Sequence, residues 1–286
     1  MSDAIQVKGL QKNYKNFTLQ NVSFSLPQGQ VMGFVGENGA GKTTTIKAIM
    51  EIIKRDAGDV LLMGQPMAGN EKALKEQIGV VLAEGQFHDV LTLGGIRSIL
   101  KNVYTTWDDA LFDKLVKQFS LPEKKPFKDF STGTKRKTAL AAALSHHPKL
   151  LILDEPTSGL DPVVREELLD LFLEFMQTAD HAILFSSHIT SDLDRIADSI
   201  TFLHQGQIVF SRDREDLTEK MGIVKCGQAL FGTLDKSRLL RLRKSAFGLE
   251  ALTDDRAFYA ERYPELMTQP ATTEEIMLFY VRGEKL

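Results

Sequence analysis

Residues 36–43, GENGAGKT, constrain the fold of this chain more than any other part of its sequence. They fit the pattern G-x-x-x-x-G-K-[ST], in which glycines let backbone amides turn inward and approach phosphate oxygens that a Cβ atom would obstruct. A strand-like stretch, QVMGFVG, leads into the loop, and TTIKAIMEII, whose apolar residues have helical spacing, follows it. The sequence therefore predicts a strand–loop–helix unit that binds the phosphates of a nucleotide.

Individual side chains of this loop have expected roles. The ammonium group of Lys42 supplies positive charge to the β- and γ-phosphates, and the hydroxyl of Thr43 is a ligand for Mg²⁺. The N-terminus of the following helix adds its positive end. A flexible glycine turn is the alternative interpretation, but the position between a strand and a helix favours phosphate binding. The predicted nucleotide-binding residues of the loop are Gly36, Glu37, Asn38, Gly39, Ala40, Gly41, Lys42, Thr43 and Thr44.

A pair of carboxylates ends the apolar run LLILDEP, which predicts a strand buried on both faces of a parallel sheet. Asp154 is expected to hold Mg²⁺ through water, and Glu155 to accept a proton from an attacking water. A solvated acidic turn after a buried strand is the ordinary alternative. The phosphate loop upstream favours the catalytic interpretation.

Composition excludes several classes of protein. Hydrophobic residues make up 43% and charged residues 26% of the chain, which is typical of a globular protein. The net charge of -3 argues against a general polyanion binder, so no nucleic-acid partner is expected. Cys226 is the single cysteine, so no intrachain disulfide can form, and we expect a small, at least partly buried thiol. Neither a secretory signal nor an apolar run of about 20 residues is visible, so we expect a protein that is cytosolic or attached to a membrane only through a partner.

Strands that alternate with helices predict an α/β fold with a mostly parallel central sheet. Before the phosphate loop, alternating apolar and polar residues indicate several short strands, which we expect to form an antiparallel part. Helical patterns dominate about residues 85–148, and SDLDRIADSI is expected to be a helix that starts at Ser191. A hairpin is expected around Gln205, Gly206 and Gln207.

The alternation ends after about residue 212, which divides the chain into a P-loop NTPase core, residues 1–212, and a small C-terminal accessory domain, residues 213–286. A final helix, TEEIMLFYV, is expected to begin with a capping box between Thr272 and Glu275. Four basic residues of this domain are interpreted as a solvated helix face, with contact to lipid headgroups or to a second copy as the alternative. They are Arg238, Arg241, Arg243 and Lys244.

The order of these motifs resembles that of ABC transporter ATPases, and the resemblance covers the predicted core. DEPTSGLD, followed by SSH after the next buried strand, is highly specific to this family. The resemblance implies an enzyme that hydrolyses ATP with Mg²⁺, with Asp154 as Walker B acid and Glu155 as catalytic glutamate. It also implies that His188 is the switch histidine, that Tyr14 stacks on adenine, and that the D-loop, SGLD, ends at Asp161. The predicted catalytic residues are Glu155, His188 and Lys42.

Two segments depart from the family pattern. The signature, usually LSGGQ, reads FSTGT here, although STGTKRK alone is also typical of a polar helix cap before a basic turn. The Q-loop glutamine falls on Ala83, and we expect Glu84 to replace it as a group that faces magnesium or water, with Gln86 as the other candidate. The predicted signature residues are Ser131, Thr132, Gly133 and Thr134, and the predicted metal ligands are Thr43, Asp154 and Glu84.

The resemblance also implies partners. Two ATP molecules are expected between two head-to-tail chains, as a homodimer or as a heterodimer with a related ATPase subunit. A separate polytopic membrane subunit would contact the helical region, which would hold the protein at the cytoplasmic face of the cell membrane. The signature, the Q-loop and the C-terminal extension resemble those of exporters of peptides, antibiotics or similar amphiphiles.

Soluble ABC-type ATPases of DNA repair or of ribosomes are the competing class. Repair members carry a long coiled-coil insertion before the signature, whereas this interval is compact here. Ribosomal members carry two cassettes, and this sequence contains one. A P-loop kinase or GTPase would not account for DEPTSGLD or for the histidine after the next strand.

Overall fold

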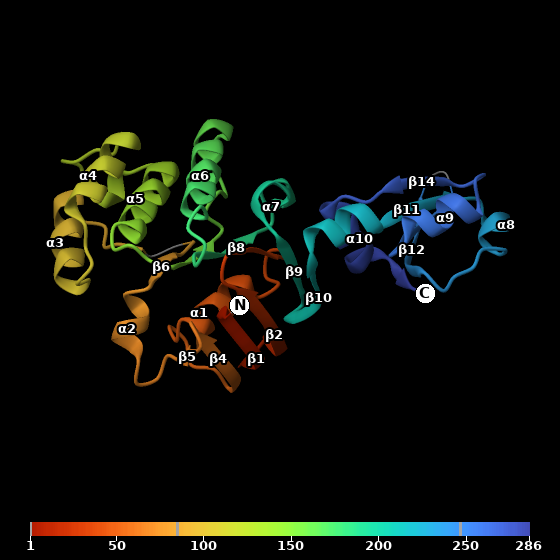
Figure 1. Ribbon diagram of the computed structural model, residues 1–286, viewed down its shortest axis with the longest axis horizontal. Coiled ribbons are helices and arrows are strands. Elements are labelled where there is room, and N and C mark those ends of the chain that lie inside the picture. Colours follow the sequence, from red (N-terminus) through yellow and green to blue (C-terminus); the bar gives the residue numbers. More distant parts are fainter. Residues whose placement is uncertain (1, 84–85, 246–247) are drawn as a thin grey trace.

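The computed structural model describes residues 2–83, 86–245 and 248–286, which form three β-sheets (Figure 1). The N-terminal sheet is antiparallel and has the strand order β2-β1-β4-β5. The expected antiparallel part is therefore confirmed, but its main strands are long. Register shifts along β1 interrupt the alternation of apolar residues, so the pattern indicated several short strands. The strands are β1 (Asp3–Tyr14), β2 (Phe17–Pro27), β4 (Ala57–Leu62) and β5 (Gln65–Pro66).

The central sheet has the strand order β10-β9-β3-β8-β7-β6 and is mostly parallel, as predicted. Neighbours from β9 to β6 run parallel, and the edge strand β10 is antiparallel to β9. Alternate residues of β3 enter two different hydrophobic clusters, one on each face, so its continuous apolar sequence matches burial on both sides. The strands are β3 (Val31–Val35), β6 (Ile78–Val81), β7 (Leu150–Asp154), β8 (Ala182–Ser187), β9 (Ser199–His204) and β10 (Gln207–Asp213).

The predicted hairpin joins β9 and β10 and also supports the phosphate loop. Its tip is Gln205 and Gly206, both with positive φ. A Cβ atom at Gly206 would lie 1.9 Å from the carbonyl oxygen of Thr18, so only glycine fits there. The amide of Gly206 donates to the carbonyl of Ala40 at 3.0 Å. The hairpin tip therefore holds one side of the phosphate loop in place.

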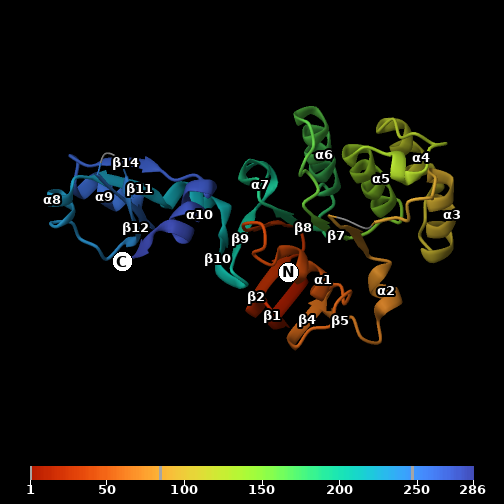
Figure 2. The same cartoon turned by 180° about the vertical axis from the view of Figure 1, so that it is seen from behind.

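Helices surround the central sheet, and three of them gather at one end. Figures 1 and 2 show α3, α4 and α5 together beyond β6, with the C-terminal sheet at the opposite end of the molecule. These helices agree with the helical pattern expected for about residues 85–148. The helices of this part of the chain are α1 (Lys42–Ile49), α2 (Glu71–Lys75), α3 (Leu93–Val103), α4 (Asp109–Gln118), α5 (Thr132–Leu144), α6 (Pro162–Phe175) and α7 (Thr190–Ile196), with a 3₁₀ turn, η1 (Phe127–Asp129).

The prediction for helix α7 was wrong at both ends. The helix begins at Thr190 rather than Ser191, and Ser191 does not cap it, because its hydroxyl accepts a hydrogen bond from Nη2 of Arg165 at 2.6 Å. The helix ends before β9 rather than running into it. Asp198 follows the helix, and its carboxylate accepts a hydrogen bond from the amide of Val31 at 2.8 Å. Long-range partners therefore set both ends of this short helix.

The C-terminal sheet is antiparallel and has the strand order β14-β11-β13-β12-β15. Cys226 ends β11 as the expected half-buried thiol, and burial raises its pKa. The strands are β11 (Gly222–Cys226), β12 (Leu239–Ser245), β13 (Gly248–Thr253), β14 (Met267–Pro270) and β15 (Glu284–Lys285). The helices are α8 (Gln228–Phe231), α9 (Arg256–Arg262) and α10 (Thr273–Arg282), with a π-helical turn, η2 (Asp216–Lys220).

Helix α10 begins with the predicted capping box. The hydroxyl of Thr272 accepts from the amide of Glu275 at 3.2 Å, and the Glu275 carboxylate accepts from the amide of Thr272 at 2.9 Å. The neighbouring basic residues lie on strand β12 or before it, not on a helix as predicted. The guanidinium groups of Arg241 and Arg243 cover the rings of Tyr280 and Phe279, which are two residues of α10.

Helix α10 also joins the C-terminal sheet to the central one. The ring of Tyr280 lies 5.4 Å from that of Phe210 in β10, and Phe279 and Ile276 are fully buried in the hydrophobic cluster that includes Phe202 of β9. Within the described ranges, no helix combines the length and the apolar character that crossing a bilayer requires.

Candidate nucleotide site

The phosphate loop connects the end of β3 to the start of α1, as predicted. Gly36 lies where a Cβ atom would be 2.4 Å from the carbonyl oxygen of Leu203, so a side chain is excluded. Gly39 and Gly41 have φ values of 83° and 112°, which favour glycine. Gly41 is also the N-cap of α1 and has no side chain to cap the helix. The N-cap residue therefore occupies none of the amides at the positive end of α1.

Lys42 is buried, and three acceptors surround its ammonium group. Nζ donates to the carbonyl oxygens of Gly36 at 2.7 Å and Glu37 at 3.3 Å, and it lies 3.1 Å from Oε1 of Glu155. An ammonium group has three N–H donors, so each of them has an acceptor in this structure. A phosphate oxygen that binds Lys42 must replace one of these partners.

Glu155 connects the lysine to the histidine that follows the next strand. Its Oε2 accepts a hydrogen bond from Nδ1 of His188 at 2.6 Å, while its side chain is only 12% exposed. Its backbone has a φ of 51°, which is unusual for a residue with a side chain. The amide of Glu155 donates to Ser186 on β8, which holds this conformation. The structure thus brings together Lys42, Glu155 and His188, the three residues with predicted catalytic roles.

Asp154 and Thr43 form the second predicted pair. The hydroxyl of Thr43 donates to Oδ2 of Asp154 at 2.8 Å, and the hydroxyl of Ser186 donates to Oδ1 at the same distance. Asp154 is fully buried. Hydroxyl and carboxylate oxygens are the ligands that Mg²⁺ prefers, so this donor set fits that ion.

A cavity of about 510 Å³ opens beside these residues. The phosphate loop, Glu155, Asn16 and Phe17 line it. Phe17 was not predicted as a site residue, although it is an aromatic residue three positions after Tyr14. Tyr14 itself is 47% exposed at the end of β1 and does not line the cavity. Stacking of adenine on Tyr14 therefore stays a prediction, and Phe17 is the aromatic ring already beside the loop.

The predicted signature and D-loop residues do not line this cavity. Ser131 is the N-cap of α5, with its hydroxyl accepting from the amide of Thr134 at 3.2 Å, and Thr132 and Gly133 belong to the first turn. The segment thus forms the cap and the first turn of α5. Asp161 caps α6 by accepting from the amides that follow it.

Of the two candidates for the Q-loop residue, the structure describes only Gln86. Glu84 lies outside the described residues. The side-chain amide of Gln86 accepts from the amide of Leu82 and donates to the carbonyl of Val80, both at 2.8 Å. Both ends of Gln86 are therefore bonded to the end of β6, which gives this residue a structural role.

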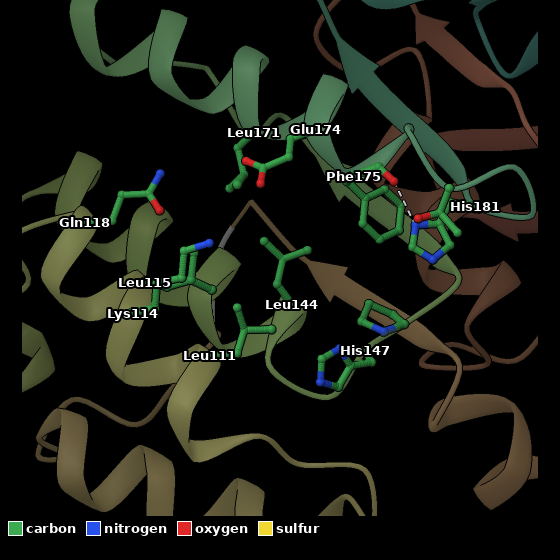
Figure 3. A pocket seen from close by; sticks show the side chains of 12 residues that line it. Leu111, Lys114, Leu115, Gln118, Leu144, His147, Leu171, Glu174, Phe175 and His181 are labelled. Atoms are coloured by element: carbon green, nitrogen blue, oxygen red, sulfur yellow. Dashed lines mark hydrogen bonds between the residues drawn. The ribbon is translucent and has the colours of Figure 1, made fainter.

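A separate cavity of about 260 Å³ lies between α4, α5 and α6 (Figure 3). Leu115, Leu144 and Leu171 form its apolar floor, while Lys114 and Glu174 lie at its exposed rim. None of the predicted site residues lines it. It marks the junction between the helical region and the core.

Comparisons with known proteins agree with this geometry. A family model described as ABC transporter matches residues 19–158. The ABC transporter ATP-binding protein YtrB of Bacillus subtilis is 32% identical over 205 residues, which are 72% of this chain and 70% of that protein. The bacitracin transport ATP-binding protein BcrA of Bacillus licheniformis is 32% identical over 212 residues, which are 73% of this chain and 69% of that protein. A solved ATP-binding subunit of an ABC transporter has a TM-score of 0.67 at 27% identity and covers 75% of this chain and 91% of that structure.

Proposed function

The chain belongs to the family of ABC transporter ATP-binding proteins, and from this premise we propose that its nucleotide sites close and open a dimer that powers a membrane exporter. It is an ATP-binding and ATP-hydrolysing subunit. The observation that carries the proposal is the position of Glu155, whose carboxylate lies between the ammonium group of Lys42 and the ring of His188.

ATP binding changes the partners of Lys42. The γ-phosphate competes with Glu155 for the ammonium group, because the other two contacts are carbonyls of the loop itself. When phosphate takes this position, the carboxylate of Glu155 loses its cationic neighbour and becomes available to a water molecule. Nucleotide binding thus prepares the base that hydrolysis needs.

Hydrolysis then needs one proton acceptor and one group that holds it in place. Glu155 accepts the proton of the attacking water, and Nδ1 of His188 fixes the carboxylate at 2.6 Å. Thr43 and Asp154 would hold Mg²⁺, which neutralises charge on the phosphates when it is bound. The positive end of α1 acts on the same phosphates.

The second half of each site comes from another chain. Ser131 and Thr132 are exposed at the start of α5, a helix of 13 residues whose N-terminal amides attract negative charge. They do not line the cavity beside their own phosphate loop. In a head-to-tail dimer, a homodimer or a heterodimer with a related subunit, this helix end meets the γ-phosphate held by the other chain. Loss of that phosphate on hydrolysis removes the contact and opens the dimer.

A polytopic membrane subunit docks on the helical region and holds the protein at the cytoplasmic face of the membrane. A groove of about 410 Å³ between α1, β6, α3 and α5 supports this proposal. Leu100, Phe87 and Ala139 give it apolar walls, and Gln86 and Tyr104 add polar groups. The similarity to a bacitracin transport protein supports export of antibiotics, peptides or similar amphiphiles.

The test is the variant Glu155→Gln. It keeps the size of the side chain but cannot accept the proton, so it should bind ATP, fail to hydrolyse it and accumulate as a dimer with ATP and Mg²⁺. Light scattering coupled to size exclusion measures the dimer. Asp170→Asn, an exposed change on α6, is the matched control and should hydrolyse ATP as the parent does. A Glu155→Gln chain that stays monomeric at every concentration of ATP and Mg²⁺ would refute the dimer proposal.

A further inference from the structure

A fully buried carboxylate lies on α7, the short helix that begins two residues after His188. The side chain of Asp192 is inaccessible to solvent. It accepts a hydrogen bond from the hydroxyl of Thr157 at 2.6 Å and forms an ion pair with Nε of Arg165. None of the steps proposed above uses this carboxylate.

The two partners of Asp192 flank the D-loop, residues 158–161. Thr157 immediately precedes the D-loop and is itself buried. Arg165 lies one turn into α6 after it, and its Nη2 also donates to Ser191 of α7 at 2.6 Å. A single carboxylate therefore fastens both ends of the D-loop to the helix that follows the switch histidine.

The burial of this group makes the connection stiff. Separating a buried carboxylate from its cation and its hydroxyl donor leaves an uncompensated charge in a medium of low polarity, which is strongly unfavourable. Movement of α7 without the D-loop would require that separation. The two segments are therefore expected to shift as one body.

We infer that Asp192 is a positioning residue that couples the switch histidine of one nucleotide site to the D-loop, and through it to the second chain. The inference rests on the proposed dimer, in which the D-loop lies beside the other chain. When γ-phosphate displaces Glu155 from Lys42, His188 of the same chain, which is bonded to Glu155, moves together with helix α7. The carboxylate of Asp192 passes that shift to Thr157 and Arg165, so occupancy of one site changes the affinity of the other.

The opposite side of α7 contacts helix α10 of the C-terminal region. Asp194, two residues after Asp192, accepts a hydrogen bond from the buried hydroxyl of Thr273 at 2.6 Å, in the first turn of α10. The C-terminal region is thus fastened to the same short helix. This contact supplies a second variant that perturbs α7 without touching the D-loop.

The experiment uses Asp192→Asn, which keeps the shape of the side chain and removes its charge. In the Glu155→Gln background, the dissociation constant of the ATP-bound dimer should rise about tenfold, which corresponds to about 1.4 kcal/mol. ATP affinity of the monomer, measured at low protein concentration, should be unchanged. In the hydrolysing protein, the Hill coefficient for ATP should fall from about two to about one.

Controls separate coupling from simple loss of helix packing. Asp170→Asn breaks an exposed ion pair with Arg195 that also joins α6 to α7, and it should leave the Hill coefficient unchanged. Asp194→Asn loosens α7 from α10 and should also leave it unchanged. Arg165→Lys keeps the charge but not the reach to Ser191, and it should change cooperativity in the same direction as Asp192→Asn.

The outcomes are distinct. If the reference Glu155→Gln chain does not dimerise, the proposed function is wrong and this inference falls with it. If it dimerises and Asp192→Asn does so equally well, with an unchanged Hill coefficient, the dimer stands and the inference is overturned. A drop in monomer ATP affinity that accounts for the whole effect would likewise overturn it, because Asp192 would then act only on its own site.

Discussion

Glu155 accepts a hydrogen bond from Nδ1 of His188 at 2.6 Å across the carboxyl ends of β7 and β8. The two residues are 33 positions apart in the chain, yet parallel strands that are neighbours in the sheet end at the same edge. The same carboxylate lies 3.1 Å from Lys42. Glu155 therefore pairs with the lysine of the phosphate loop as well as with the histidine, and in the proposed mechanism phosphate binding to Lys42 frees its carboxylate.

Replacing Lys42 with methionine should remove the group for which phosphate and Glu155 compete. Lys42→Met keeps the apolar stem but loses all three donors, so hydrolysis should become undetectable and the dissociation constant for ATP should rise by about tenfold or more. Equilibrium binding of a fluorescent ATP analogue measures the affinity. Lys47→Met, on the last turn of the same helix, is the control and should bind as the parent does. Unchanged affinity in Lys42→Met would show that the lysine does not contact phosphate.

The ring of Phe17 should contribute to nucleotide affinity. It lines the cavity beside the phosphate loop, and a Cβ atom at Gly41 would lie 2.7 Å from its ring. Phe17→Ala should raise the KM for ATP about two- to twelvefold, because an aromatic contact contributes about 0.5–1.5 kcal/mol. Phe17→Leu should keep part of the parental affinity for ATP if packing on the loop matters, and Phe17→Tyr should keep nearly all of it. Comparison with Tyr14→Ala decides which ring contacts adenine. If only Tyr14→Ala raises the KM for ATP, Phe17 does not contact the adenine.

The parts of this protein that could be predicted from the sequence have local causes. Glycines in the phosphate loop and the apolar run before Asp154 act within a few residues, so their pattern indicates the loop and the buried strand directly. The capping box of α10 is equally local, because Thr272 and Glu275 lie within one turn. The roles of Glu155 and His188 came from the resemblance, and the contact between them requires β7 and β8 to be neighbours in the sheet.

The parts that the sequence did not reveal depend on distant partners. Ser191 has the local properties of a helix cap, but Arg165, 26 residues away, takes its hydroxyl, and the helix begins one residue earlier. Arg241 and Arg243 are charged residues of the kind that usually face solvent, yet their side chains cover aromatic rings of α10. Their spacing of two residues places them on the same face of a strand. The inward position of Phe17 depends on the register of β1 and β2, which bulges shift.

Protonation of His146 should make stability depend on pH. Its ring stacks on Tyr104 at 3.9 Å and Nε2 lies 3.2 Å from the carbonyl of Ile78. Nδ1 is buried and forms no hydrogen bond with the described part of the chain. Burial lowers the pKa of His146 below its ordinary value of 6.5. In the unfolded chain this histidine takes up a proton near pH 6.5 while the folded one does not, so the free energy of unfolding should fall as pH decreases below about 6.5.

The variant His146→Gln isolates that effect, because an amide can donate to Ile78 but does not titrate. The difference in unfolding free energy between pH 7.5 and pH 5.5, measured by urea denaturation, should be smaller in His146→Gln than in the parent. His88→Gln, at an exposed position, is the control and should keep the parental difference. An identical pH dependence in His146→Gln and the parent would mean that His146 is not the group responsible.

Glu84 and Gln86 should respond to mutation in opposite ways, which decides the assignment of the Q-loop. Gln86 is bonded to Leu82 and Val80 at the end of β6, so Gln86→Ala leaves two backbone groups without partners and should reduce the free energy of unfolding by about 1–3 kcal/mol. Its Mg²⁺ requirement for hydrolysis should stay at the parental value, because the side-chain oxygen is turned to the backbone amide of Leu82. Glu84→Ala should do the reverse. The free energy of unfolding should stay near the parental value, and the Mg²⁺ concentration for half-maximal hydrolysis should rise several-fold, because a carboxylate ligand has been removed.

Magnesium titrations of ATPase activity and urea denaturation of both variants give the two readouts. If Glu84→Ala leaves the Mg²⁺ requirement and turnover untouched, then this chain hydrolyses ATP without a side chain at the Q-loop position, since Ala83 offers no ligand.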